Sequence, residues 1–145
     1  MNFNNLLIRY FGLGNIHFAP GSFASLFILI LWYYVPNNFY LQFFILLLHL
    51  IIGFCSCYLY YSHDNIDNDP SFIVIDEVVG MIVCLFLIPK IIGAYIIAFI
   101  LFRFFDIFKP SIIYRSQKLT YGIGIMADDL IAGFITFLIV SGLYF

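Results

Sequence analysis

The stretch Phe72-Ile73-Val74-Ile75-Asp76-Glu77-Val78-Val79-Gly80-Met81 places two adjacent carboxylates at the front of an apolar run that continues to Ile88. A carboxylate inside a membrane helix costs roughly 2.5–3.5 kcal/mol on insertion scales, so it normally has a partner and a function. Asp128-Asp129 opens a second such run, and Asp106 closes a third. The pattern predicts that the fold brings these five carboxylates together at one surface of a bilayer.

The composition is that of an integral membrane protein. Of the 145 residues, 64% are hydrophobic and 10% are charged, whereas a soluble domain is nearer half apolar and a quarter charged. We therefore predict an all-α fold, a polytopic membrane helical bundle, with residues 1–145 forming a single domain. The chain has no basic stripe, which argues against nucleic acid as a partner. The sequence leaves the oligomeric state open and is compatible with a homo-oligomer.

Five apolar runs predict about five spanning helices. The runs comprise residues 23–35, 39–61, 72–88, 91–105 and 127–145. The first run is short for a span, so we expect it to tilt or to lie in thinned bilayer. Residues 1–11 are too few and too polar to span. Their apolar positions 3, 7, 8 and 11 share one helix face, which predicts a short interfacial helix at the N-terminus.

Basic residues set the predicted orientation. Because the runs alternate in direction, the loops 62–71 and 106–126 share a side with the N-terminus. That side carries Arg9, Arg103, Lys109, Arg115 and Lys118, and the other side carries only Lys90. The positive-inside rule then assigns the first side to the cytoplasm. The same alternation places Ser22 and all five carboxylates at cytoplasmic helix ends. The positive-inside rule uses only basic residues, so this convergence of the acidic residues is an independent result.

Clustered carboxylates at low dielectric repel one another, and a cation among them relieves the repulsion. Oxygen ligands favour Mg²⁺, which often shares its coordination with a substrate phosphate. Neighbours on a helix point about 100° apart, so within each acidic pair one residue is expected to bind metal and the other to bind a second metal or handle a proton. Gly80 and Gly133 each follow an acidic residue by one turn and would let neighbouring helices approach closely. The predicted metal ligands are Asp76, Glu77, Asp106, Asp128 and Asp129.

Cations and glycines on the same side fit a phosphate. Arg103 precedes Asp106 by three residues, so it either pairs with that carboxylate or binds phosphate bidentately. The glycines that precede the last apolar run either form an anion-binding turn at a helix start or simply return the chain to the membrane. The predicted phosphate-binding residues are Ser22, Arg103, Lys109, Gly122 and Gly124.

No covalent nucleophile is evident. None of the three cysteines is followed six positions later by Arg, and the Pro20-Gly21-Ser22-Phe23 turn offers no His. Metal-activated water is therefore the economical mechanism. The predicted catalytic residues are Asp76, Glu77, Arg103 and Asp129, with Glu77 as the candidate to accept the proton of the water.

Four segments resemble the bacterial phosphatidylglycerophosphatase A family. They are Pro20-Gly21-Ser22 with Ser25-Leu26, and residues 75–81, 102–110 and 122–133. They occur in the order and spacing of the family, although Ala24 stands where a glycine is expected. The resemblance implies a Mg²⁺-dependent, multi-pass enzyme of the bacterial cytoplasmic (inner) membrane, with its active site facing the cytoplasm. Its substrate would be a membrane phospholipid: phosphatidylglycerophosphate would be hydrolysed to phosphatidylglycerol and inorganic phosphate.

Two other classes of membrane protein use intramembrane acids. An ion- or proton-coupled transporter or channel subunit remains the alternative function, although transporters usually place such groups near the bilayer midplane. A phosphatidyl-group transferase would carry an Asp-Gly-x-x-Ala-Arg stretch, which this chain lacks.

Overall fold

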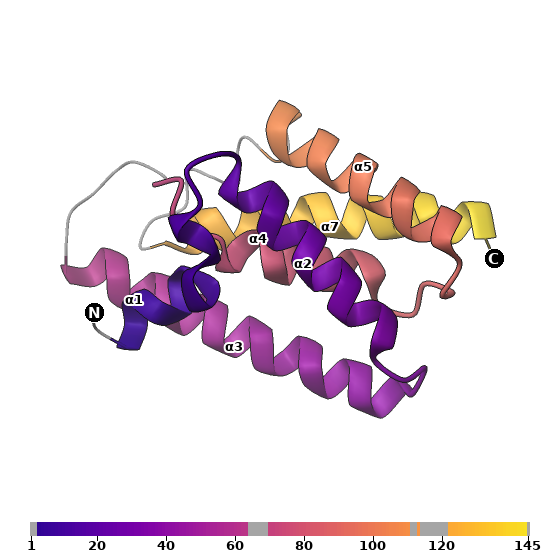
Figure 1. Cartoon of the computed structure of the whole chain (residues 1–145), viewed down its shortest axis with the longest axis horizontal. Coiled ribbons are helices and arrows are strands. Elements are labelled where there is room, and N and C mark those ends of the chain that lie inside the picture. Colours follow the sequence, from indigo (N-terminus) through magenta and orange to yellow (C-terminus); the bar gives the residue numbers. More distant parts are fainter. Residues whose placement is uncertain (1–2, 64–69, 111–112, 114–121, 145) are drawn as a thin grey trace.

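The computed structural model describes residues 3–63, 70–110, 113 and 122–144, and every regular element in these ranges is helical (Figure 1). The prediction of an all-α fold is confirmed for this part of the chain. The elements in order are α1 (Phe3–Ile8), the 3-10 helix η1 (Tyr10–Asn15), α2 (Pro20–Tyr34), α3 (Phe39–His63), α4 (Ile75–Leu85), α5 (Ile92–Phe108) and α7 (Ile123–Tyr144).

Two of these helices, α3 and α7, are long and apolar enough to cross a membrane, and α2 is a shorter apolar helix. The expectation of five full-length spans is not confirmed. The run 72–88 forms a helix of only 11 residues, α4, which is roughly 16 Å long at about 1.5 Å per residue. The helix leaves out both ends of the run, since Val74 is the residue before its first turn and Phe86 the residue after its last. Val74 donates its N–H to the carbonyl of Ile8 at 2.9 Å.

The short helix α4 is the centre of the bundle. All of its residues except Glu77 and Val83 are buried. It packs most extensively against α7, and the contact is made through glycine: a Cβ on Gly133 would overlap the carbonyl oxygen of Gly80. The predicted close approach of helices at these two glycines is therefore confirmed. Both acidic pairs lie one turn before these glycines, so the contact brings the two pairs together.

The N-terminal segment differs from its prediction. Instead of one helix to residue 11, α1 ends at Ile8 and η1 follows, with positive φ angles at Tyr10 and Phe11. Ile8 is buried, whereas Phe3 and Phe11 are 74% and 69% exposed. The segment is held to the bundle by hydrogen bonds, including Asn4 Nδ2 to the Ser56 carbonyl at 3.1 Å. The apolar positions 3, 7, 8 and 11 therefore do not form one face of a single helix, and part of the segment packs against α3 instead. Contact of this segment with the membrane interface remains a prediction.

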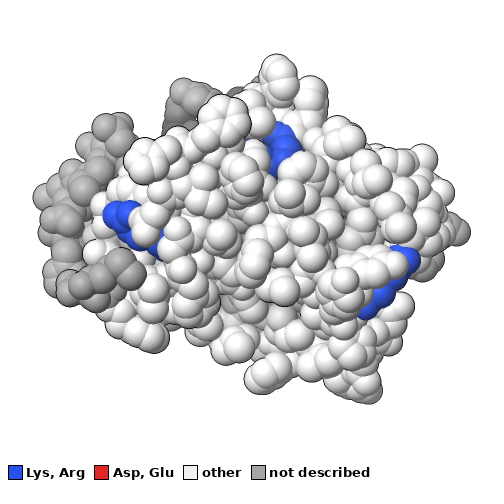
Figure 2. Space-filling view, viewed as in Figure 1, with Lys and Arg blue, Asp and Glu red and all other residues white. Residues whose placement is uncertain are grey.

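The outside of the bundle is largely apolar. Large side chains such as Phe44, Ile51 and Ile100 are more than half exposed. On the described part of the face in Figure 2, isolated Lys and Arg side chains interrupt an otherwise uncharged surface, and no acidic side chain is visible. Apolar surface of this extent marks a membrane or protein contact. The acidic residues of the site lie inside the bundle instead.

Candidate active site

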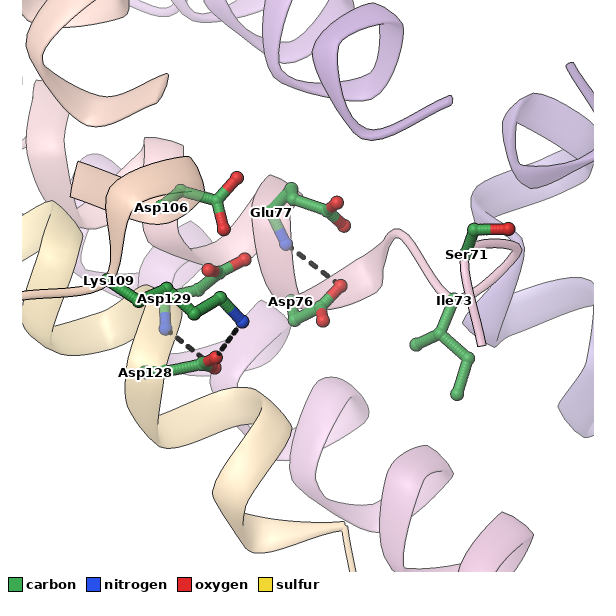
Figure 3. A pocket seen from close by; sticks show the side chains of 8 residues that line it. All are labelled: Ser71, Ile73, Asp76, Glu77, Asp106, Lys109, Asp128 and Asp129. Carbon is green, nitrogen blue, oxygen red and sulfur yellow. Dashed lines mark hydrogen bonds and ion pairs between the residues drawn. The ribbon is translucent and has the colours of Figure 1, made fainter. Parts of the chain in front are cut away.

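A pocket of about 200 Å³ opens where α4 and α7 begin and α5 ends (Figure 3). All five predicted carboxylates line it, although they come from three helices and span residues 76 to 129. The complete lining is Ser71, Ile73, Asp76, Glu77, Asp106, Lys109, Asp128 and Asp129. The alternation of helix directions that the sequence predicts is what brings these helix ends together (Figure 1).

Three of the carboxylates form one group. Oxygen atoms of Asp76, Glu77 and Asp129 lie within 4.8 Å of one another. Asp76 and Asp129 are 5% and 3% exposed, and Oε2 of Glu77 is buried with no hydrogen-bond partner among the described residues. Three close carboxylates in a poorly solvated pocket repel one another, and a hard divalent cation would relieve that repulsion. The donor set and the unpartnered oxygen therefore fit a metal ion.

The other two carboxylates bind cations of the protein. Asp128 accepts a hydrogen bond from Lys109 Nζ at 2.6 Å, and its second oxygen accepts the Asp129 N–H at 3.0 Å. Asp106 forms an ion pair with Arg103 on the same face of α5. The five predicted ligands are therefore divided into a group of three and two ion pairs. Of the two interpretations of Arg103, the pairing with Asp106 is present, and its buried Nε has no partner among the described residues.

Backbone geometry at the helix ends orients the side chains of Lys109, Asp76 and Glu77 toward the pocket. Lys109 takes a left-handed conformation, with φ of 40°, at the end of α5 and donates its N–H to the carbonyl of Phe105. This turn, followed by Pro110, ends the helix and lets the Lys109 side chain reach α7. Asp76 and Glu77 occupy the first turn of α4, where the helix dipole favours negative charge. The Glu77 N–H also donates to Oδ1 of Asp76 at 3.0 Å, which fixes that carboxylate.

Four predicted site residues lie outside the pocket lining: Ser22, Arg103, Gly122 and Gly124. Gly122 has φ of +73° and packs against α3, where an added Cβ would be 2.8 Å from the Cys57 carbonyl oxygen. Gly124 is buried within α7. Ser22 lies in the first turn of α2, and the cap residue is Ala19. The turn at Gly122 thus serves a helix contact rather than the lining of the pocket.

Sequence reasoning missed three residues at the site. Ser71 and Ile73 line the pocket from the segment before α4, and Gly21 lies against the Glu77 carboxylate. Ser71 and Ile73 could have been predicted, because they lie only a few residues before the acidic pair Asp76-Glu77 in the sequence. No local signal connects Gly21 with Glu77, because the two residues are far apart in the sequence.

Comparison with known proteins identifies the family of the chain. The sequence model of Phosphatidylglycerophosphatase A matches residues 6–144. The chain belongs to the phosphatidylglycerophosphatase A family. This confirms the resemblance of the four segments and, at the level of the family, the prediction of a phosphatase. The family match gives no support to the alternative function, an ion- or proton-coupled transporter or channel subunit.

Two relatives carry the family name. A Phosphatidylglycerophosphatase A of Haemophilus influenzae is 37% identical over 145 residues, which cover 97% of this chain and 88% of the relative. One of Escherichia coli is 33% identical over 137 residues, covering 91% and 78%. A Bacteroides thetaiotaomicron protein, provisionally named a phosphatidylinositol-3-phosphatase, is 34% identical over 140 residues, covering 90% and 87%. No solved structure matches the chain.

Proposed function

We propose that this protein hydrolyses the terminal phosphomonoester of phosphatidylglycerophosphate, giving phosphatidylglycerol and inorganic phosphate. The observation that carries the proposal is the grouping of Asp76, Glu77 and Asp129 in one pocket with Lys109, in a chain of the phosphatidylglycerophosphatase A family. Water supplies the attacking oxygen, the bond between phosphorus and the glycerol oxygen breaks, and the glycerol oxygen takes up a proton.

The grouped carboxylates would hold Mg²⁺. When bound, this ion would neutralise charge on the phosphoryl group and make water at the pocket more acidic. Asp76 and Asp129 are buried and suit the role of fixed ligands. Glu77 would contribute one oxygen to the ion, and its unpartnered Oε2 is the candidate to accept the proton of the attacking water.

The two ion pairs would bind the phosphate. Asp128 holds Lys109 at the pocket wall, and Asp106 holds Arg103 behind it. Fixed positive charge aimed at the phosphoryl oxygens stabilises the charge that develops as the bond breaks. Ser22, Gly122 and Gly124 have no part in this proposal. They lie outside the pocket lining, as Arg103 does, but Arg103 is paired with Asp106, which lines the pocket.

The pocket would open to the cytoplasmic side of the bacterial inner membrane, in a single domain that crosses the bilayer five times. The predicted alternation of the apolar runs puts five of the six basic residues on the same side as the pocket, which supports that orientation. In this arrangement α2, α4 and α5, which are shorter than α3 and α7, would cross only as parts of the bundle and in thinned bilayer. The acyl chains of the lipid would remain in the bilayer while its phosphate entered the pocket.

Phosphate release from lipid in mixed micelles tests the proposal. The purified protein should release phosphate from phosphatidylglycerophosphate in Mg²⁺, stop in EDTA and recover when Mg²⁺ is restored. Phosphatidic acid and phosphatidylinositol 3-phosphate provide competing substrates, the second because of the name of the Bacteroides relative. Asp76→Asn is the inactive control. Faster turnover of either competing lipid would assign another substrate, and turnover undiminished by EDTA would refute the metal site.

A further inference from the structure

Gly21, in the first turn of α2, lies directly against the Glu77 carboxylate. A Cβ built on Gly21 would overlap Oε1 of Glu77 and stand 2.7 Å from its Cδ, so no side chain fits between them. The backbone of Gly21 is not left-handed, and alanine is the better helix former. Backbone conformation therefore does not explain a glycine at this position, whereas contact with Glu77 does.

Gly133 and Gly14 differ from Gly21 because the atoms nearest to them belong to the backbone. A Cβ on Gly133 would strike the carbonyl of Gly80, and one on Gly14 would strike the carbonyl of Phe72. At those positions an added side chain has to push two elements apart. At Gly21 the obstructing atoms are the end of a flexible side chain, so an added methyl group would displace the Glu77 carboxylate and leave α2 in place.

We propose that Gly21 is a positioning residue: it sets how far the Glu77 carboxylate extends toward Asp76 and Asp129, and so sets the affinity of the metal site. The inference rests on the metal site of the proposed function. The position of α2 is itself fixed, because Ala24 is completely buried against the core and the buried Trp32 Nε1–H donates to the carbonyl of Leu85 in α4 at 3.2 Å. The start of α2 is therefore a firm wall behind the carboxylate.

Metal binding by Gly21→Ala tests this role without any lipid. Binding of Mn²⁺ to the full chain in detergent is measured from the electron paramagnetic resonance signal of the free ion. Gly21→Ala should raise the dissociation constant tenfold or more, while the unfolding temperature stays at or above that of the wild type. Glu77→Asp shortens the side chain by one methylene and makes room for the added methyl group. The double variant Gly21→Ala/Glu77→Asp should therefore bind Mn²⁺ more tightly than Gly21→Ala.

Gly142→Ala is the matched control, because a Cβ at Gly142 meets nothing within 4 Å, and it should bind Mn²⁺ like the wild type. Wild-type affinity in Gly21→Ala would overturn the proposal. So would a double variant that binds no better than Gly21→Ala, or a fall in unfolding temperature together with the loss of binding, since that result would mean that α2 had moved. A wild type that binds Mn²⁺ but does not hydrolyse phosphatidylglycerophosphate would refute the proposed function and leave the role of Gly21 standing.

Discussion

Gly133→Ala should disable the site although Gly133 lines no part of the pocket. An added Cβ would stand 3.0 Å from the carbonyl carbon of Gly80 and 3.3 Å from its Cα. Carbon atoms in contact settle at about 3.5–4.0 Å. The nearest atom, the Gly80 carbonyl oxygen, would overlap the Cβ, so the two helices have to separate by about 1 Å to admit the methyl group.

The separation would carry Asp129 away from Asp76 and Glu77. Because a misplacement of about 1 Å can lower a rate about 10²-fold, we expect turnover to fall roughly 10–100-fold. Overpacking destabilises a protein by about 1–3 kcal/mol, and the better helix propensity of alanine returns up to about 1 kcal/mol. The net loss of unfolding free energy should be about 0–2 kcal/mol, so the variant should still fold.

Phosphate release and thermal unfolding, measured in the same detergent, separate the two effects. Gly142→Ala is the control on the same helix, because nothing lies within 4 Å of a Cβ at that position, and it should keep wild-type turnover. A folded Gly133→Ala variant with wild-type turnover would show that the close contact between α4 and α7 does not assemble the site.

Four further measurements test the proposed roles. Asp76→Asn should remove most phosphate release at every Mg²⁺ concentration and leave the unfolding temperature near that of the wild type; wild-type turnover at low Mg²⁺ would exclude Asp76 as a ligand. Arg103→Lys should lower kcat about tenfold, because an ammonium group cannot pair with Asp106 and also bind phosphate bidentately; unchanged kcat and KM would leave Arg103 a structural role. Lys109→Met should lower both activity and unfolding temperature, since it breaks an ion pair with the buried Asp128; adding Asp128→Asn should restore only the stability. A reporter fused to the C-terminus should read periplasmic, and a cytoplasmic signal would contradict the five-span topology.

Features that depend on neighbouring residues could be predicted from the sequence. The apolar runs predicted the helices that the described ranges contain, because helix periodicity and helix-breaking residues such as Pro36 and Pro89, which follow two of these runs, act locally. The alternation of run directions was enough to predict that five carboxylates share one end of the bundle. The spacing of three residues on one helix face made pairing with Asp106 one of the two predicted roles of Arg103, and the structure contains that pair.

Contacts between distant segments were decided only by the tertiary structure. The hydrogen bond from Val74 to Ile8 joins the start of run 72–88 to the N-terminal segment, and no propensity in that run signals it. The division of the acids into three grouped carboxylates and two ion pairs depends on where α5 and α7 cross α4. The ion pair Lys109–Asp128 joins residues 19 apart. Sequence periodicity shows which face of a helix is apolar, but which residues of two helices meet depends on crossing angles and close contacts that only packing in three dimensions determines.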